Sequence, residues 1–398
     1  MTFRSTKGNK LEGASEVNFR TAVLQCLPPH GGLYVPSSAI DLRRFIQYVD
    51  TGTSFKDFVA VATPALLPGE LSPADSFAIA EDACKNFSPE IKQLDENFSL
   101  LLIDTGPTGC YKDFGLAFLA ALLKNHIEHA EPILLVTAAG DRAGISVAHA
   151  FAGIQGVSSV ILYPEGELHG LDSSAFVTNG GNILPIQVSG SFDDCQRLVE
   201  ELVADDEFNK RYHSTSANTI NVGRLLPQTF YYLYAFIKIR KRLVGDLIFS
   251  VPSGNYGNLL SGLYAWKFGM PVNGFLAALN RNTPLLDVAE PANYERLEAF
   301  QKESPAVMKH MVRSVAVSDT ETFAASKEAK EKYWFDLGPT GALSYAAALR
   351  QSELFETGTH TVIMRTVRPE RDEQYRNVFQ PVTTIKPELE ALEGAISI

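Results

Sequence analysis

The sequence predicts an α/β protein with parallel sheets. From about residue 98 onward, short apolar runs of strand length alternate with stretches of helical length. This alternation is typical of right-handed strand–helix–strand crossovers, which cover the faces of a sheet with helices. Ligands of such sheets bind beyond the carboxyl ends of the strands, and several of the loops expected there are rich in small residues.

The expected elements follow one another in a regular order. Residues 1–95 are mixed, with turn-rich segments followed by helical patterning. The apolar runs predict strands at 100–103, 132–137, 157–163, 182–188, 246–252 and 361–366, and the stretches between them predict helices at 114–122, 144–151, 193–203, 228–243 and 259–268.

Composition excludes several classes of partner. The 398 residues are 45% hydrophobic and carry a formal net charge of −11, which argues against nucleic acid but permits an anionic small substrate. The polar N-terminus lacks an apolar signal core, and no apolar run approaches the ~20 residues that span a bilayer, so we expect no membrane association. Four widely spaced cysteines without a C-x-x-C pair (Cys26, Cys84, Cys110, Cys195) predict reduced thiols and a cytoplasmic location. We expect a monomer or a homodimer.

Lys112 is the candidate catalytic residue. It lies in Thr105-Gly-Pro-Thr-Gly-Cys-Tyr-Lys112-Asp-Phe-Gly, between an apolar strand and an apolar helix. We expect a buried amine at this junction, and a neutral amine forms a Schiff base with an aldehyde. The alternative for this residue alone is a surface lysine in the first turn of a helix.

A second motif predicts a phosphate site. Ser253-Gly-Asn-Tyr-Gly-Asn258 follows an apolar strand and precedes a helix, so that its backbone N–H groups converge at the positive end of the helix dipole. The motif lacks the Gly-Lys-Ser/Thr of a nucleotide P-loop. The alternative is a glycine-rich turn that exists only for close packing.

A Schiff-base lysine together with a separate monophosphate site indicates pyridoxal phosphate, an aldehyde that carries one phosphate. The predicted cofactor-binding residues are Lys112, Ser253, Gly254, Asn255, Tyr256, Gly257 and Asn258.

Five segments in the same order resemble the threonine synthase family. They are Arg4-Ser-Thr-Lys-Gly with Val17-Asn-Phe, Gly32-Leu-Tyr-Val-Pro, the Lys112 motif, Thr215-Ser-Ala-Asn-Thr-Ile-Asn-Val-Gly-Arg224, and the Ser253–Asn258 loop. The resemblance implies the tryptophan-synthase-β-like fold, type II among pyridoxal-phosphate enzymes, with two open parallel-sheet lobes and an N-terminal domain. It implies an N-terminal domain at 1–95, a large cofactor-binding lobe at 96–124 and 216–398, and a small mobile lobe at 125–215.

The resemblance also assigns residues to roles. Thr366 would face the pyridine nitrogen of the cofactor, the alternative being a strand-end hydroxyl that satisfies the backbone. Asn218, Asn221 and Arg224 would lie on the substrate side, although Arg224 has the alternative of an ion pair with a carboxylate.

The substrate-binding segments depart from the family pattern. Thr137-Ala-Ala-Gly-Asp-Arg-Ala-Gly replaces the usual Thr-Ser-Gly-Asp-Thr-Gly, so the expected substrate loop consists of Ala139, Gly140, Asp141 and Arg142 and lacks two hydroxyls. Arg142 would either clamp a carboxylate or phosphate bidentately or remain a solvated arginine.

The C-terminal motif also changes. Thr366-Val-Arg368-Pro-Glu370-Arg371 replaces Thr-Ala-His-Pro-Ala-Lys, and Arg368 is a further candidate for the substrate's anionic group. His169 is either a substituted substrate contact or a loop histidine, and His126 and His129 form a helix-surface pair rather than a metal site.

Three functions remain open on the sequence. The first is a pyridoxal-phosphate dependent carbon–oxygen lyase that eliminates or replaces a phosphate on an amino acid, with O-phosphohomoserine and water giving threonine and phosphate. The second is a divergent phospholyase or replacement enzyme acting on a related amino acid. The third is a non-catalytic paralogue that binds the cofactor, against which the intact Lys112 motif argues.

Overall fold

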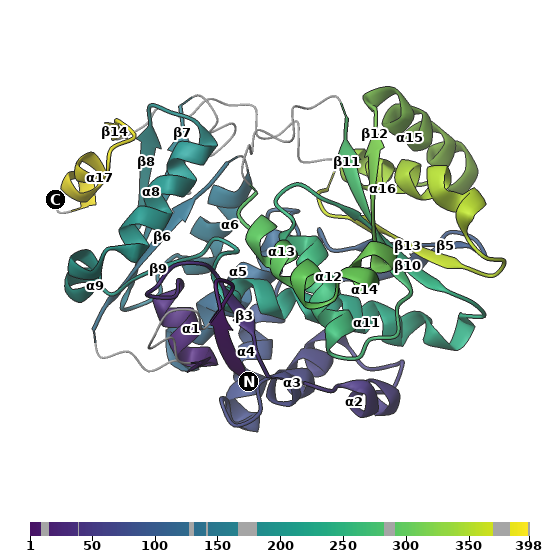
Figure 1. Ribbon diagram of the computed structural model, residues 1–398, viewed down its shortest axis with the longest axis horizontal. Helices are drawn as coiled ribbons and strands as arrows, with labels where there is room; N and C mark the ends of the chain where they lie inside the picture. The colour runs from purple at the N-terminus through teal and green to yellow at the C-terminus, as the bar shows by residue number, and fades with distance from the viewer. Residues whose placement is uncertain are drawn as a thin grey trace.

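The computed structural model describes residues 1–8, 16–38, 40–126, 131–140, 142–165, 181–281, 291–368 and 383–396, with the backbone alone for residues 125, 126 and 142. Within this part of the chain the fold is the predicted one, with two lobes that each contain a largely or wholly parallel sheet and an N-terminal unit that lies below both in Figure 1.

The N-terminal unit combines a small antiparallel sheet with four helices. The sheet has the order β2-β1-β3, and the helices precede the first strand of the large lobe. The bounds are β1 (Thr2–Ser5), β2 (Val17–Asn18), α1 (Phe19–Gln25), β3 (Tyr34–Pro36), α2 (Arg43–Tyr48), α3 (Phe55–Leu66) and α4 (Pro73–Cys84).

The large lobe contains a six-stranded sheet with the order β12-β11-β10-β13-β5-β4. All neighbours pair in parallel except β4, which is antiparallel to β5. The strands are β4 (Glu90–Gln93), β5 (Phe98–Leu102), β10 (Leu247–Pro252), β11 (Gly274–Asn280), β12 (Val312–Val317) and β13 (His360–Arg365). Its helices are α11 (Thr229–Ile239), α12 (Gly257–Lys267), α13 (Tyr294–Glu303), α14 (Pro305–Met311), α15 (Asp319–Tyr333) and α16 (Gly338–Gln351).

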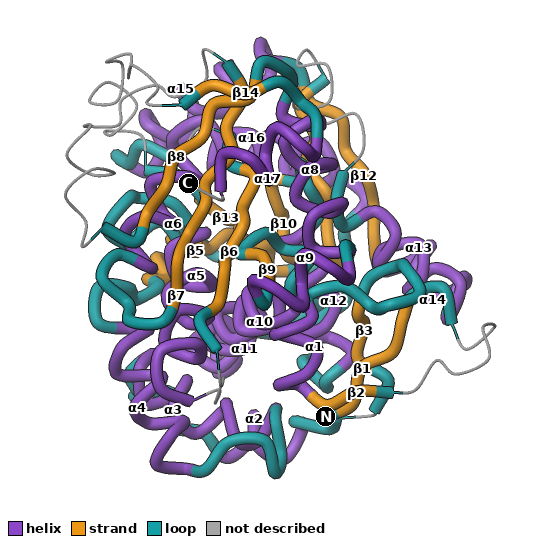
Figure 2. The backbone as a smooth tube through the Cα atoms, turned by 90° about the vertical axis from the view of Figure 1, so that its left-hand side faces the viewer, coloured by secondary structure: helices purple, strands orange, loops and turns teal. Residues whose placement is uncertain are grey.

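The small lobe contains a five-stranded sheet with the order β14-β8-β7-β6-β9, parallel throughout. Figure 2 shows its long strands running side by side. The strands are β6 (Ile133–Ala138), β7 (Val157–Pro164), β8 (Ile183–Val188), β9 (Ser214–Ser216) and β14 (Thr384–Ile385). The helices associated with the two lobes and their junction are α5 (Lys112–Ala121), α6 (Arg142–Phe151), α8 (Phe192–Ala204), α9 (Asp206–Tyr212), α10 (Val222–Leu225) and α17 (Leu389–Ile396), and a π-helical turn, Leu122–His126, extends α5.

Strand β5 shows why the large sheet is buried on both faces. Leu100 and Leu102 pack in one apolar cluster with residues of α15 and α16, whereas Leu101 and Ile103 belong to another cluster with α11 and α12. Side chains that alternate along a strand point to opposite faces, so an uninterrupted apolar run is required where helices cover both. The segment after Leu102, the last residue of β5, leads to Lys112 at the start of α5.

Two segments form contacts across the predicted domain boundaries. Strand β4 lies within the predicted N-terminal domain but pairs with β5 in the large sheet, because its backbone completes the edge of that sheet. Residues 383–396, assigned to the large lobe, instead return to the small lobe: β14 pairs with β8, and Leu392 packs in the same apolar cluster as Leu198 of α8.

Other predicted features can be compared directly. The four cysteines are free thiols. Within the described ranges, no helix has both the length and the apolar character needed to cross a bilayer.

Candidate active site

The site forms where three strands of the large lobe end together. Arg365 of β13 pairs with Leu102 of β5, and Ile363 of β13 pairs with Ser250 of β10, so the carboxyl ends of all three strands lie at one edge. The Lys112 motif follows β5, the Ser253–Asn258 loop follows β10, and Thr366 follows β13. Segments separated by as many as 264 residues in the sequence therefore converge at this edge, as expected for an open parallel sheet.

The backbone around Lys112 is held by the segment after β13. The Tyr111 N–H donates to the Thr366 carbonyl at 2.9 Å, and the Arg368 N–H donates to the Gly109 carbonyl at 2.8 Å. Thr366 is buried, and its carbonyl is bonded to Tyr111, the residue before Lys112. These bonds therefore hold the Thr366 segment beside the Lys112 segment. The side chain of Lys112 is half-buried, not buried as the sequence predicts, because it lies at the first residue of α5, where the helix end meets the edge of the site.

Asp113 is a site residue that the sequence reasoning did not single out. Its carboxylate accepts from the Thr108 N–H at 2.9 Å and from the Thr108 hydroxyl at 2.6 Å, which closes the loop before Lys112. A Cβ at Gly106 would lie 2.6 Å from the Asp113 Cβ, so only glycine fits there. The signal in the sequence was an acidic residue in the first helical turn, where it stabilises the N–H groups of the preceding loop.

The Ser253–Asn258 loop presents backbone N–H groups at the start of α12. Tyr256 adopts a left-handed conformation with φ of 55°, which turns the chain into the helix. The N–H groups of Asn255, Tyr256 and Gly257 have no acceptor among the described residues. The Ser253 hydroxyl donates to the Val251 carbonyl at 2.9 Å, so this side chain satisfies the end of β10.

Polar contacts from behind the loop hold it in place. Asn255 accepts from the Ala292 N–H at 2.5 Å through its side chain and from Asn293 Nδ2 at 3.1 Å through its carbonyl. A Cβ at Gly257 would lie 3.2 Å from Thr219 Cγ2 and 3.3 Å from Asn293 Nδ2, which is tighter than ordinary contact. The loop is thus a rigid concave surface of N–H donors, the geometry that a phosphate group requires.

The side chain of Asn258 adds a further N–H donor next to this surface. Its side-chain oxygen lies 2.7 Å from the Tyr231 hydroxyl and 3.0 Å from the Tyr232 hydroxyl, whereas its Nδ2 is buried and has no acceptor among the described residues. A buried donor without an acceptor is costly and is expected where a ligand supplies the missing atom.

The predicted substrate loop lies at the end of β6 in the small lobe. The Ala139 N–H donates to the Leu162 carbonyl at 2.8 Å, and the Ala139 side chain is packed in the apolar core. Gly140 is half-buried and accepts from the Ala143 N–H. Asp141 lies outside the described residues, and Arg142 is the first residue of α6 with its backbone alone described. His129, His169, Glu370 and Arg371 also lie outside the described residues.

The two predicted substrate-side asparagines have structural hydrogen bonds. Asn218 clamps Ala138 at the end of β6, since its Oδ1 accepts from the Ala138 N–H and its Nδ2 donates to the Ala138 carbonyl, each at 2.8 Å. Asn221 is fully buried and donates to the Val23 carbonyl and Thr215 Oγ1 while accepting from the Gly223 N–H. Both N–H groups of the Asn221 amide are thus used within the fold, and its oxygen already accepts one bond, so Asn221 is not proposed as a substrate contact.

Arg224 is a buried cation beside the lysine motif. The side chain is 3% exposed, one guanidinium nitrogen donates to the Ala217 carbonyl, and Nε has no acceptor within the described part of the chain. Burial lowers the pKa of Arg224, while electrostatic contact with Tyr111 and Cys110 opposes that shift. It has no carboxylate partner among the described residues, so the alternative of an ion pair is not supported.

Arg368 braces the loop before Lys112. One of its guanidinium nitrogens donates to the Asp104 carbonyl at 3.0 Å, and the Asp104 carboxylate pairs with Arg365 at 2.7 Å. Burial raises the pKa of Asp104, opposed chiefly by the neighbouring Arg365 cation.

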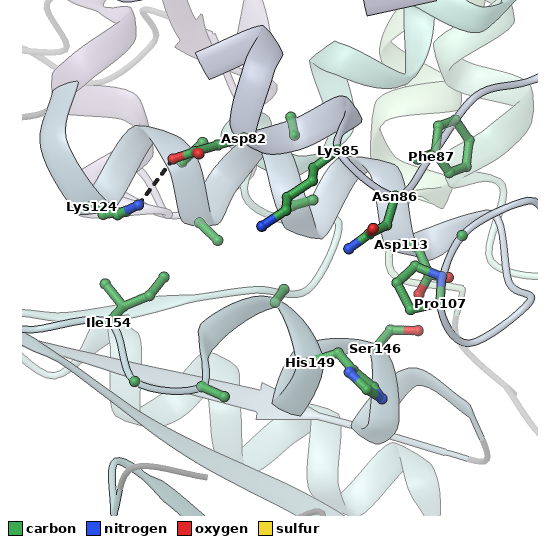
Figure 3. Close-up of a pocket in the computed structure, with 18 of the residues that line it drawn as sticks. Asp82, Lys85, Asn86, Phe87, Pro107, Asp113, Lys124, Ser146, His149 and Ile154 are labelled. Carbon is green, nitrogen blue, oxygen red and sulfur yellow. Dashed lines mark hydrogen bonds and ion pairs between the residues drawn. The ribbon is translucent and has the colours of Figure 1, made fainter. Parts of the chain in front are cut away.

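A cleft of about 1140 Å³ lies behind the lysine motif, between α4 and α5 on one side and α6 on the other. Figure 3 shows Lys85 and Asn86 on its upper wall and Ser146 and His149 on its lower wall. Its lining includes Gly106, Pro107, Asp113 and Arg368 but neither Lys112 nor the Ser253–Asn258 loop, so this cleft is a neighbour of the candidate site rather than the site itself. Across the described residues, no cluster of histidine, cysteine or acidic side chains has the arrangement of a metal site.

Comparisons with known proteins agree with this geometry. Residues 84–366 match the family described as pyridoxal-phosphate dependent enzyme. A threonine synthase from Serratia marcescens is 32% identical over 366 residues, covering 86% of this chain and 84% of the relative. The crystal structure of threonine synthase from Escherichia coli aligns with a TM-score of 0.84 at 27% identity and covers 100% of this chain and 99% of the other. The structure of a PLP-bound threonine synthase from Brucella melitensis aligns with a TM-score of 0.82 at 23% identity over 100% and 98% of the two chains, which bears on the fold alone.

Proposed function

The chain belongs to the threonine synthase family of pyridoxal-phosphate dependent enzymes, and from this membership we propose that it converts O-phosphohomoserine and water to threonine and phosphate. The observation that supports the proposal most strongly is the convergence of Lys112, Thr366 and the Ser253–Asn258 loop at one edge of the large sheet. In the strand order β10-β13-β5, the segment with Thr366 follows the middle strand, the Ser253–Asn258 loop follows one neighbour and the Lys112 motif follows the other. This order supports a ring-shaped cofactor with its aldehyde on one side and its phosphate on the other.

The residues present fit pyridoxal phosphate. Lys112 would hold its aldehyde carbon, the free N–H groups of residues 255–257 with Asn258 would hold its phosphate, and Thr366 would contact its ring nitrogen. When bound, the cofactor supplies a conjugated ring that accepts the charge of a substrate carbanion. The Lys112 amine would take the proton from the α-carbon of the substrate.

We place the substrate side of the site at the end of β6, together with Arg224. The N-terminus of α6, which begins at Arg142, directs its positive end toward this side and favours an anionic group. Arg224 has donors unused within the described chain and is the candidate for the second anionic group of the substrate. Arg142 and Asp141 remain predictions from the sequence.

A second candidate substrate is favoured by one observation. Ala139 stands where the family pattern has serine, and its methyl group is packed in the core, so this position offers no hydroxyl to a carboxylate. A phospholyase or replacement enzyme acting on a related phosphorylated amino acid is therefore the alternative. The free cysteines are compatible with the cytoplasmic location that we propose, and a monomer or homodimer remains our proposal for the assembly.

Product analysis by NMR tests the proposed function. The protein, supplied with pyridoxal phosphate, is offered O-phosphohomoserine, phosphoserine and phosphothreonine in parallel. We expect threonine and inorganic phosphate from the first substrate and none from a Lys112→Ala variant. Turnover of phosphoserine or phosphothreonine alone would favour the alternative, and turnover of none of the three would contradict both.

A further inference from the structure

Two tyrosine hydroxyls contact the side chain of Asn258, the last residue of the Ser253–Asn258 loop. Asn258 is also the second residue of α12, and it is 4% exposed. Two consecutive residues of α11, Tyr231 and Tyr232, direct their hydroxyls at its side-chain oxygen, at 2.7 Å and 3.0 Å. The Tyr232 hydroxyl also lies 2.9 Å from the Asn258 carbonyl, and the Tyr231 hydroxyl lies 3.2 Å from Gln228 Oε1.

These contacts determine which end of the Asn258 amide faces the loop. The Tyr231 hydroxyl lies nearer to the Asn258 amide oxygen, at 2.7 Å, than to Gln228 Oε1, at 3.2 Å, so its one hydrogen is directed at the amide oxygen and the NH₂ end points away from the tyrosines. The opposite orientation would direct a carbonyl oxygen at the N–H cradle and repel any anion bound there. In the observed orientation Nδ2 is a buried donor with no acceptor among the described residues.

Both hydroxyls keep their hydrogens. Tyr231 and Tyr232 are completely buried, and burial raises the pKa of each well above its usual value of 10.0. The hydroxyls therefore remain donors over the whole range in which the protein is expected to work.

We propose that Tyr231 and Tyr232 are positioning residues that orient the Asn258 amide so that its Nδ2 donates to the phosphate of the cofactor. The inference rests on the proposed function, because it takes the Ser253–Asn258 loop to be the phosphate site. The tyrosines touch neither cofactor nor substrate; they act by making one of two amide orientations more favourable.

The test compares pyridoxal phosphate with pyridoxal, which has the same aldehyde but no phosphate. Dissociation constants of both are measured by absorbance titration of the full-length apoprotein. Tyr231→Phe/Tyr232→Phe removes both hydroxyls and keeps both rings, so the apolar packing is retained. We expect affinity for pyridoxal phosphate to fall about tenfold, the usual worth of a hydrogen bond to a charged group, and affinity for pyridoxal to stay within about twofold.

Five further variants sharpen the result. Asn258→Leu should lose a similar factor toward pyridoxal phosphate, and adding the two phenylalanine substitutions to Asn258→Leu should cause no further loss, because all three residues act through one amide. The single variants Tyr231→Phe and Tyr232→Phe serve if the double variant unfolds. Tyr234→Phe is the matched control, since this hydroxyl on the same helix makes no hydrogen bond to a described residue.

The outcomes separate this inference from the proposed function. Equal weakening of pyridoxal and pyridoxal phosphate by the double variant would mean a general packing role and would overturn the inference. Additive losses in the triple variant would also overturn it. If the unsubstituted protein binds pyridoxal phosphate no more tightly than pyridoxal, the loop is not a phosphate site, and it is then the assignment of the cofactor site that fails.

Discussion

At Lys112 the backbone is fixed much more tightly than the side chain. Its neighbour Tyr111 is bonded to Thr366, and its neighbour Asp113 closes the preceding loop onto Thr108. The amine itself has no hydrogen-bond or ion-pair partner among the described residues and is half-buried. A lysine with a fixed Cα and a free amine can hold an aldehyde in one step and a proton in the next without movement of the helix.

The first residue-scale prediction is that reduction with borohydride attaches the cofactor to Lys112. The Lys112 motif follows β5 and the Ser253–Asn258 loop follows β10, and both strands end at the same edge of the sheet, so one cofactor molecule would reach both segments. Peptide mapping by mass spectrometry should find the modification at Lys112, and Lys112→Ala should abolish the visible absorbance. Lys124→Ala, which alters an exposed lysine paired with Asp82, is the control and should retain it. Modification of a different lysine would refute the assignment.

At the scale of elements, the loop and α12 form one unit. Tyr256 closes the first helical bond by accepting from the Leu260 N–H at 2.9 Å, and Asn255 ties the loop to residues 292 and 293. The donors are therefore aimed before any ligand arrives, and little ordering is needed on binding.

This rigidity predicts a strong effect of Gly257→Val. The new side chain would meet Thr219 and Asn293 behind the loop and would displace the loop and its N–H groups, so cofactor affinity should fall by on the order of tenfold or more. Gly394→Ala in α17 is the control, because nothing lies within 4 Å of a Cβ built there. Titration with pyridoxal phosphate measures both variants, and unchanged affinity in Gly257→Val would show that the loop serves packing only.

The whole molecule contains a buried histidine at the opposite end of the large sheet, where the strands begin. His360 is 4% exposed, with Nδ1 3.0 Å from the Glu96 carbonyl and Nε2 2.8 Å from the Ser99 hydroxyl, and Arg242 donates to the same hydroxyl at 2.9 Å. Burial is the main cause that lowers the pKa of His360 below 6.5, with the Arg242 cation acting in the same direction and the Glu96 carbonyl and Asp95 opposing.

Stability should therefore fall as the pH drops through and below 6.5. The unfolded chain gains a proton at His360 in that range while the folded protein resists it, so the free energy of unfolding is greatest above 6.5 and declines below. Urea denaturation at several pH values should show a smaller decline in His360→Gln than in the unsubstituted protein. His149→Gln, at an exposed histidine, is the control and should keep the original dependence. Equal slopes for all three proteins would exclude His360 as the source.

The sequence predicted the large-scale architecture well, because apolar runs buried on both faces and short glycine-rich loops are strong local signals. Strands β6, β7, β8, β10 and β13 lie within one or two residues of their predicted bounds. The family assignment is also confirmed, while the roles of the lysine motif and of the Ser253–Asn258 loop stay predictions. What could not be predicted depends on contacts between distant segments.

Three residues illustrate that limit. Asn221 matched a family motif, yet its amide nitrogen donates to the Val23 carbonyl and to Thr215 Oγ1. No local sequence pattern reveals these contacts. Tyr231 and Tyr232 read simply as apolar helix residues, since only the folded chain places their hydroxyls on Asn258. The return of residues 383–396 to the small lobe was missed because β14 has only two residues and no strand-length signal.

That return has a consequence for how the protein is made. Strand β8 has its edge completed by β14, whose partner residues Gln187 and Thr384 are separated by nearly half the chain. A ribosome that has delivered every residue of the cofactor site has not yet delivered this strand. Before β14 has been made, the growing small lobe would expose the edge of β8, which is the kind of surface that pairs with other chains. Strand β14 thus covers this edge only after the segments of the candidate site have been synthesised.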